Sequence, residues 1–407
     1  MSISAVDASQ LPGRLGAAYA DYMSEFNKDY RSTTEMATHA ANWADANDRI
    51  NRINALNSAS YSSGGDTLRL RHNFSSDMST EEYHQHLGRS QQSSSGGRGQ
   101  TRGGVRGGQS SDSGMSWNDA DHTLGDHHGV NHVTSGVMGP VKDQGACGSC
   151  YAFAALSALE AAISIKTGEP PVRLSEQEQV DCSNNFYGTQ YGNWGCSGGL
   201  EYNTWDYVRD NGSFTNADYP YNGNENNCDR QQVDPRVTVS PGEVTGWNRL
   251  QRSVAEIIDH LDEKPLSIGI DADCDEFRWY GSGIISADKC QVTNDYMNHA
   301  VVIVGYDMGT AQLQSRQAMV PKVAKWWFYE EDDGNPTPDP DPSPEPEPTP
   351  DPDPEPEPQP TSEAYYLIQN SWATSWGENG FVRFGMAEGR GVACMNCDVT
   401  YPILSTV

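Results

Sequence analysis

The stretch KDQGACGSCYAF (142–153) places two cysteines three residues apart, in a glycine-containing loop that runs directly into an apolar segment. A zinc half-site would need a second Cys-x-x-Cys at a suitable distance, and Cys394 and Cys397 stand at the far end of the chain. A thioredoxin-like redox pair would need a preceding βαβ pattern, which the sequence lacks. Cys147 lies in the loop and can be paired in a disulfide. Cys150 opens a predicted helix (150–166), whose free N–H groups and dipole favour a thiolate, so the pattern indicates that Cys150 is a nucleophile.

The composition describes an acidic chain that is globular at least in part. Of its 407 residues 36% are hydrophobic, and the formal net charge is -29. Because like charges repel, nucleic acid and anionic membrane surfaces are not expected partners, and no stretch approaches 18 consecutive apolar residues. The nine cysteines are an odd number, and all lie between Cys147 and Cys397. One thiol is therefore expected to stay free in an oxidising compartment.

Composition also divides the chain into blocks. After a tail (1–17), residues 18–58 are expected to be helical, because apolar and aromatic residues recur every three to four positions. The segment 88–116 is rich in glycine, serine and arginine and is predicted to be a flexible linker. In the acidic segment 310–363, proline alternates with other residues from 336 to 360, which predicts a disordered, extended insertion.

The block 117–407 changes from a helical half to a strand-rich half. Short β-branched or aromatic runs bounded by turn residues predict strands. These runs are PLSIGIDA (265–272), HAVVIVGYD (299–307), YYLIQN (365–370) and GFVRFGM (380–386). Helices followed by strands predict an α+β architecture with a cleft between the two halves.

Several motifs occur in an order that is specific to one family. They are PVKDQGACGSCYAF (140–153), LSEQEQVDCS (174–183), GCSGG (195–199), NHAVVIVGY (298–306) and YYLIQNSWATSWGENGFVRF (365–384). Through them the chain closely resembles the papain and cathepsin L family of cysteine peptidases over residues 130–403, apart from the insertion. The resemblance implies a papain-like fold, with a helical left lobe, a β-barrel-like right lobe and the active-site cleft between them. It also implies hydrolysis of peptide bonds without a metal or cofactor.

The resemblance assigns the catalytic roles. Cys150 is the nucleophile, and His299, at the start of a strand, is its imidazolium partner and protonates the leaving amine. Asn370 orients the imidazole, and Trp372 covers that hydrogen bond from water. The side-chain amide of Gln144 faces the developing oxyanion together with the backbone N–H of Cys150.

Substrate-binding residues follow from the same resemblance. Gly198 and Gly199 let an extended peptide pair with the backbone. The pocket for the second substrate residue upstream of the cut is walled by Leu200, Glu201, Gly269, Met297 and Ala300, with its floor near Asp398. An inward carboxylate there would favour a basic residue, and we expect arginine to be accepted as well as leucine or phenylalanine.

Three disulfides are implied by the resemblance: Cys147 with Cys196, Cys182 with Cys228, and Cys290 with Cys394. Cys274 and Cys397 then remain, either as a fourth bridge or as two free thiols.

The helical N-terminal block resembles the inhibitory propeptide of the same family. Glu35, Trp43, Ile50 and Asn54 match the propeptide pattern, whereas His39 stands where arginine is usual. The segment HNFSSDMSTEEY (72–83) resembles the part that follows. Residues 18–87 are therefore expected to inhibit the block 117–407 until the chain is cut in or just after the linker.

Tyr151 departs from the family, which usually has tryptophan after the nucleophile. This tyrosine resembles silicateins, silica-depositing relatives with a serine nucleophile, and acidic proline-rich segments are common in mineral-associated proteins. A structural or biomineral-templating role is thus the alternative to a lysosomal or extracellular endopeptidase that acts as a monomer on polypeptides. A calcium-buffering role would explain only the acidic insertion.

Overall fold

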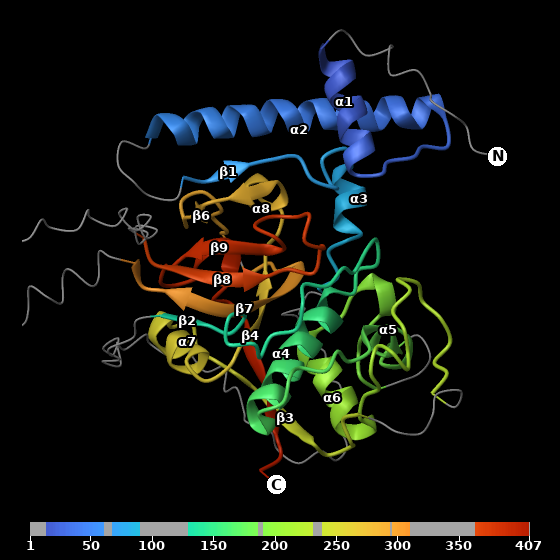
Figure 1. The fold of residues 1–407 in the computed structure, drawn as a ribbon, viewed down its shortest axis with the longest axis vertical. Coiled ribbons are helices and arrows are strands. Elements are labelled where there is room, and N and C mark those ends of the chain that lie inside the picture. The colour runs from blue at the N-terminus through green and yellow to red at the C-terminus, as the bar shows by residue number, and fades with distance from the viewer. Residues whose placement is uncertain are drawn as a thin grey trace, which may run out of the picture.

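The computed structural model describes residues 14–60, 67–89, 129–185, 190–230, 238–293, 295–309 and 363–406. The predicted tail (1–17), linker (88–116) and insertion (310–363) lie mostly outside these residues. The described part of the chain forms two lobes, with the N-terminal helices at one end of the molecule (Figure 1).

The helical lobe is built around α4 (Cys150–Thr167), which packs against α5 (Glu176–Cys182), α6 (Glu201–Asn211) and three strands of the other lobe. Most of α4 is buried because small and apolar side chains cover nearly its whole circumference, and Gly168 ends the helix with a positive φ of 73°. By length and composition α4 could cross a membrane, but 67% of it is buried inside the protein, as expected of a core helix. A short 3₁₀ turn, η3 (Gly195–Ser197), precedes α6.

The second lobe is a sheet with the strand order β3-β10-β4-β7-β8-β9-β6, in which β2 also pairs with β7. The pairs are antiparallel except β6 with β9. The strands are β2 (Gly129–Asn131), β3 (Val244–Arg249), β4 (Leu266–Ile270), β6 (Ile284–Ile285), β7 (His299–Asp307), β8 (Tyr365–Gln369), β9 (Phe381–Gly385) and β10 (Val399–Leu404). The four strands predicted from the sequence are therefore present as β4, β7, β8 and β9.

Strand β7 connects the two lobes. It is buried along almost its whole length, because α4 packs against it and other strands pair with both its edges. Ala300, near its start, belongs to the same buried cluster as Cys150, the first residue of α4. Three short elements complete the lobe: α7 (Val254–Leu261), α8 (Asp275–Arg278) and η4 (Val392–Cys394).

The N-terminal block contains two helices, α1 (Arg14–Glu25) and α2 (Thr33–Ser60), instead of the single helix expected over 18–58. The chain leaves the first helix at Asn27, whose φ is 49°. Ser32 then begins the second helix by accepting a hydrogen bond from the N–H of Glu35 at 3.1 Å.

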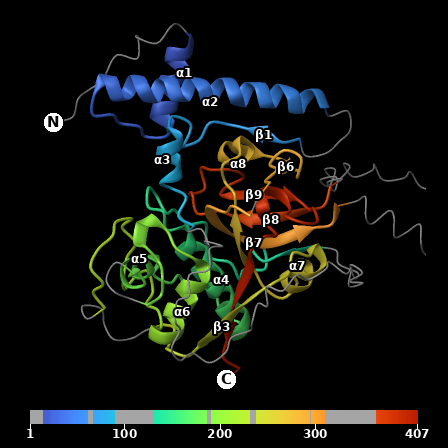
Figure 2. The same cartoon turned by 180° about the vertical axis from the view of Figure 1, so that it is seen from behind.

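The rest of the N-terminal domain (14–60 and 67–89) runs back along the protein. Strand β1 (Arg69–Leu70) pairs with β5 (Tyr280–Ser282) beside the sheet lobe. Helix α3 (Thr80–His84) then leads from α1 and α2 toward the junction of the two lobes, as both views show (Figures 1 and 2).

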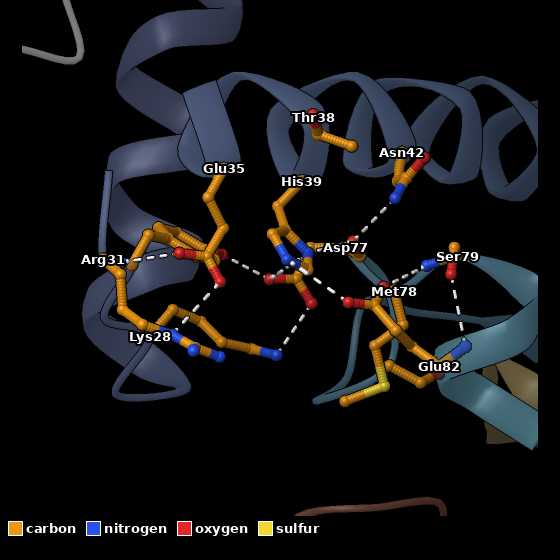
Figure 3. A network of polar contacts seen from close by, with 12 residues as sticks. Lys28, Arg31, Glu35, Thr38, His39, Asn42, Asp77, Met78, Ser79 and Glu82 are labelled. Carbon is orange, nitrogen blue, oxygen red and sulfur yellow. Dashed lines mark hydrogen bonds and ion pairs between the residues drawn. The ribbon is translucent and has the colours of Figure 1, made fainter. Parts of the chain in front are cut away.

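Asp77 ties this segment to the first two helices (Figure 3). Its carboxylate accepts hydrogen bonds from Lys28 at 2.7 Å, from Tyr22 at 2.8 Å and from Tyr30. The Nδ1 of His39, the residue that replaces the usual arginine, lies 2.7 Å from the backbone oxygen of Asp77. One buried carboxylate therefore fixes where the chain turns toward the cleft.

Eight of the nine cysteines form four disulfides, and Cys150 is the free thiol that the odd count predicted. The pairs Cys147–Cys196 and Cys182–Cys228 are those that the resemblance implied.

The expected bridge between Cys290 and Cys394 was wrong, because Cys290 is bonded to Cys274 and Cys394 to Cys397. Cys394 has a φ of 62° and begins a tight turn, in which the N–H of Cys397 donates to the Cys394 carbonyl at 2.8 Å. Cys290 still lies beside this turn, since its carbonyl accepts from the N–H of Ala393 at 3.0 Å. The four cysteines share one region, so their spacing in the sequence does not decide which pairs form.

Candidate active site

Cys150 lies at the N-terminus of α4 with no exposed surface. The N–H of Gly88, from the N-terminal domain, donates to its sulfur at 3.3 Å. Burial raises the pKa of the Cys150 thiol to about 12, although hydrogen bonds from the backbone of Ala300 and Gly88 act in the opposite direction. The thiolate favoured by the helix N-terminus is therefore suppressed while the N-terminal domain covers the cleft.

His299 is the first residue of β7, and its Nε2 lies 2.8 Å from Oδ1 of Asn370. An amide oxygen only accepts, so Nε2 carries the proton and Nδ1 is left with its lone pair. This Nδ1 is buried and has no hydrogen-bond partner among the described residues. Burial lowers the pKa of His299 to about 4, against the opposing effect of Asn370. In the covered state the site therefore holds a neutral thiol and a neutral imidazole.

Trp372 stacks on the ring of His299, with centroids 4.7 Å apart and planes at 27°. It is 2% exposed, and Phe277 and Tyr83 pack edge-on against it. Tyr83 comes from the N-terminal domain. The ring therefore excludes water from the hydrogen bond between His299 and Asn370.

The side-chain amide of Gln144 is held in a defined orientation. Its Oε1 accepts from the hydroxyl of Ser371 at 2.6 Å, which turns its NH₂ group away from Ser371. That NH₂ group donates to the backbone oxygen of His86, at 2.8 Å, and to that of Cys147, at 2.9 Å. A carbonyl of the N-terminal domain thus accepts the hydrogen bond that Gln144 was predicted to donate to the oxyanion.

Gly199 pairs with the N-terminal domain in the manner expected for a substrate. Its N–H donates to the carbonyl of Gly88 at 2.8 Å, while the N–H of Arg89 donates to the carbonyl of Asn298 at 3.0 Å. A side chain at 199 would not fit, since a Cβ there would lie 2.4 Å from Oδ1 of Asn193 and 2.8 Å from the ring of Tyr151. Gly199 can therefore pair with an extended peptide although residue 151 is tyrosine and not the usual tryptophan.

Gly198 turns the chain toward this edge with a φ of 114°, which favours glycine.

The side chain of Arg89 enters the pocket predicted for the second substrate residue. Its Nε lies 3.1 Å from a carboxylate oxygen of Glu201, its Nη2 donates to Asp398, and its Nη1 is 3.8 Å from the sulfur of Met297. A Cβ on Gly269 would lie 2.5 Å from Cζ of Arg89, so the glycine leaves the space that the guanidinium fills. Asp398 therefore points inward.

Two residues expected to wall this pocket belong to buried clusters. Leu200 packs into the core of the helical lobe, and Ala300 packs with Cys150. Gly88 and Arg89, the first two residues of the segment predicted to be a linker (88–116), are buried in the cleft. Composition could not reveal this, because a glycine and an arginine fit the linker as well as the cleft.

Two contributors to the site were not predicted from the sequence. Ser371 orients Gln144, and the carbonyl of Asn298 pairs with the N-terminal domain. Each residue directly adjoins a predicted one, Asn370 or His299, and this adjacency was the signal available.

The comparison with known proteins agrees with this arrangement. The model of the papain family cysteine protease matches residues 129–331 and 353–403, more than half of the chain, and the cathepsin propeptide inhibitor domain matches residues 19–83. The Oryzain gamma chain of Oryza sativa subsp. japonica is 30% identical over 66% of this chain and 58% of its own length. The Cathepsin L-like proteinase of Phaedon cochleariae is 29% identical over 70% of this chain and 68% of its own.

Among solved structures, digestive procathepsin L 3 from the larval midgut of Tenebrio molitor shares the fold, with a TM-score of 0.66 at 22% identity over 96% of this chain and 100% of that one. The expected α+β, papain-like fold with a helical N-terminal domain is therefore confirmed. Because the family match spans both lobes and the inhibitor match spans the helices above them, this chain belongs to the papain family of cysteine proteases.

Proposed function

We propose that this chain, once its N-terminal domain has been removed, hydrolyses peptide bonds as a cysteine endopeptidase. The observation that supports this most directly is the hydrogen bond from Gln144 to the carbonyl of His86. A substrate carbonyl in the place of the His86 carbonyl would receive the same donor. Two residues further along, the N–H of Gly88 donates to the sulfur of Cys150.

The reaction proceeds in two halves. After uncovering, the proton of Cys150 moves to Nδ1 of His299, and the thiolate attacks the substrate carbonyl carbon. The oxyanion accepts hydrogen bonds from Gln144 and from the N–H of Cys150. His299 returns the proton to the leaving amine, the C–N bond breaks and a thioester remains. Water then attacks the thioester, with His299 taking its proton, and the acid product leaves as the thiol re-forms.

In each half-reaction Asn370 holds the imidazole through the hydrogen bond to Nε2, so that Nδ1 faces the reaction.

We further propose that the chain is made as a zymogen and acts as a monomer on polypeptides in a lysosomal or extracellular compartment. Four disulfides favour an oxidising environment. The structural or biomineral-templating alternative depends on Tyr151 and on the composition of residues 310–363, nearly all of which lie outside the described residues.

A labelling experiment tests the peptidase function. The chain is cut with an added protease and acidified, then treated with a peptidyl epoxide that alkylates active-site thiols, while hydrolysis of a fluorogenic peptide is followed. We expect one label per chain, complete loss of turnover on labelling, and neither label nor turnover in Cys150→Ala processed in the same way. Turnover by the purified Cys150→Ala variant would contradict the mechanism.

A further inference from the structure

The pocket beside Cys150 holds a guanidinium with contacts on both of its sides. The side chain of Arg89 is 3% exposed, and those of Glu201 and Asp398 are 1% and 5% exposed. Charged groups are rarely buried this deeply unless they are paired. The site is therefore built to hold a cation, and the N-terminal domain supplies one.

The charges of the pocket do not cancel once Arg89 has left. Arg249 on β3 pairs with Asp398 from the other side, with its Nε 2.7 Å from Oδ1, and it stays with the protease lobes. Among the described residues, Arg89 is the one cation that forms an ion pair with Glu201. Removal of the N-terminal domain therefore leaves two carboxylates and one guanidinium, and Glu201 is the carboxylate without a cation.

We propose that Glu201, acting with Asp398, makes arginine the preferred second residue upstream of the cut, with lysine next. This specificity rests on the peptidase function proposed above. A neutral side chain such as leucine would dehydrate Glu201 without pairing its charge, which costs free energy, whereas a basic side chain restores the pair.

Arginine fits better than lysine because the two carboxylates contact different nitrogens of one planar guanidinium. Glu201 accepts from Nε and Asp398 accepts from Nη2 of the same guanidinium. A lysine ammonium is a single point charge and lacks this planar arrangement. The absence of a side chain at Gly269 provides the width that the planar group needs.

The first test needs only the wild-type enzyme after removal of its N-terminal domain. Three fluorogenic peptides differ at the second residue upstream of the cut: arginine, its neutral isostere citrulline, and leucine. We expect kcat/KM for arginine to exceed that for citrulline by about tenfold to a hundredfold, the range of a charge-assisted hydrogen bond. Equal rates for arginine and citrulline would overturn the inference, because the two side chains differ in charge and hardly in shape.

The second test assigns the selection to Glu201. In Glu201→Gln we expect the arginine-to-leucine ratio of kcat/KM to fall by about tenfold or more, mainly through KM for the arginine peptide. The leucine peptide reports any general loss in the same variant. Glu263→Gln, an exposed glutamate after α7, serves as the matched control and keeps the wild-type ratio.

The outcomes separate this inference from the peptidase function. The proposed specificity is overturned if kcat/KM for the leucine peptide is tenfold higher than that for the arginine peptide. It is also overturned if the arginine-to-leucine ratio of kcat/KM is the same in Glu201→Gln as in the wild type. Either result leaves the peptidase function standing. Failure of the processed wild type to cleave any of the three peptides overturns both. If Glu201→Gln does not fold, the comparison of arginine with citrulline decides alone.

Discussion

The backbone N–H of Gly88 donates to the sulfur of Cys150 at 3.3 Å, and the carbonyl of the same glycine accepts from Gly199 at 2.8 Å. One residue of the N-terminal domain therefore covers the nucleophile and occupies the edge at which substrates pair. The carbonyl of His86 takes the donor of Gln144 in the same way. We therefore expect the N-terminal domain to inhibit by occupying the site, in which the hydrogen bond between His299 and Asn370 is already present.

We expect Cys150 to resist alkylation in the full-length chain. Burial raises its pKa from 9.0 to about 12, so at pH 5 to 8 the thiolate is about a thousandfold rarer than for an ordinary cysteine. Iodoacetamide labelling, followed by mass spectrometry of the Cys150 peptide, should be slow in the intact chain and fast after removal of the N-terminal domain. Equal labelling rates before and after removal of the N-terminal domain would show that the cleft of the intact chain is already open.

Replacement of Tyr83 by alanine should weaken the inhibition. Its ring is 1% exposed, contacts Trp372 and lies under the guanidinium of Arg278, while its hydroxyl donates to the carbonyl of Ala272 at 2.8 Å. Loss of such an aromatic ring costs about 3–5 kcal/mol, whereas Tyr83→Phe loses about 1 kcal/mol with the hydrogen bond. The full-length alanine variant should therefore hydrolyse peptide at neutral pH more than the phenylalanine variant. The same low activity in both variants would mean that this anchor is dispensable.

Much of the architecture was accessible from the sequence because local signals agreed with one another. The apolar run after Cys150 predicted α4 closely, with a helix expected over 150–166 and found over Cys150–Thr167, since a buried helix leaves a clear pattern. Strand β7 was predicted because its sequence is a short β-branched run bounded by turn residues.

Features that depend on contacts between distant segments were less accessible. The pairing of Cys274 with Cys290 depends on how two loops of the sheet lobe meet, and spacing does not encode this. The position of Arg89 depends on Glu201 and Asp398, which lie 112 and 309 residues away in the chain. Its own neighbours in the sequence predict only a linker.

Replacement of Asn370 by alanine should reduce turnover less than replacement of Cys150. Asn370 fixes the imidazole of His299 without taking part in bond making, so the loss in kcat should stay below the about 10²–10⁴-fold that acid–base catalysis supplies. The measurement is kcat for a fluorogenic peptide, with the exposed Asn248→Ala on β3 as control. A loss as complete as that of Cys150→Ala would assign Asn370 a chemical role of its own.

Removal of residues 312–362 should leave catalysis nearly unchanged. Strands β7 and β8 already pair up to Asp307 and Tyr365, and a Cβ on Gly309 would lie only 2.8 Å from the carbonyl carbon of Glu363. The chain ends on either side therefore meet, and a short glycine-rich turn can join them. Since each doubling of a surface loop costs only about 0.6 kcal/mol, turnover of a small peptide should stay within a few-fold. A collapse of turnover with retained epoxide labelling would mean that the insertion contributes to substrate binding.

Buried histidines make the covered state sensitive to acid. Burial lowers the pKa of His299 to about 4, and it also lowers the pKa of His86, which the N-terminal domain contributes to the cleft. A group with a lowered pKa in the covered state stabilises that state above the pKa of the free group, near 6.5, and this stabilisation is lost as pH falls toward the lowered value. Between pH 6.5 and 4, each pH unit should favour uncovering by about 1.4 kcal/mol through His299, and His86 acts in the same direction.

We therefore expect the full-length chain to become active as the pH falls from 6.5 toward 4, and His86→Gln to move the midpoint of activation to lower pH. Glutamine keeps a side-chain N–H that can donate to the carbonyl of Glu82, as His86 does at 3.1 Å, but it cannot take up a proton. The measurement is the rate at which the intact chain acquires epoxide label after transfer to buffers between pH 4 and 7, with His260→Gln on α7 as the control. If the N-terminal domain uncovers Cys150 at the same pH in His86→Gln and in the wild type, His86 does not contribute to the acid response. Release that increased with rising pH would reverse the sign derived from His299 and refute the histidine mechanism altogether.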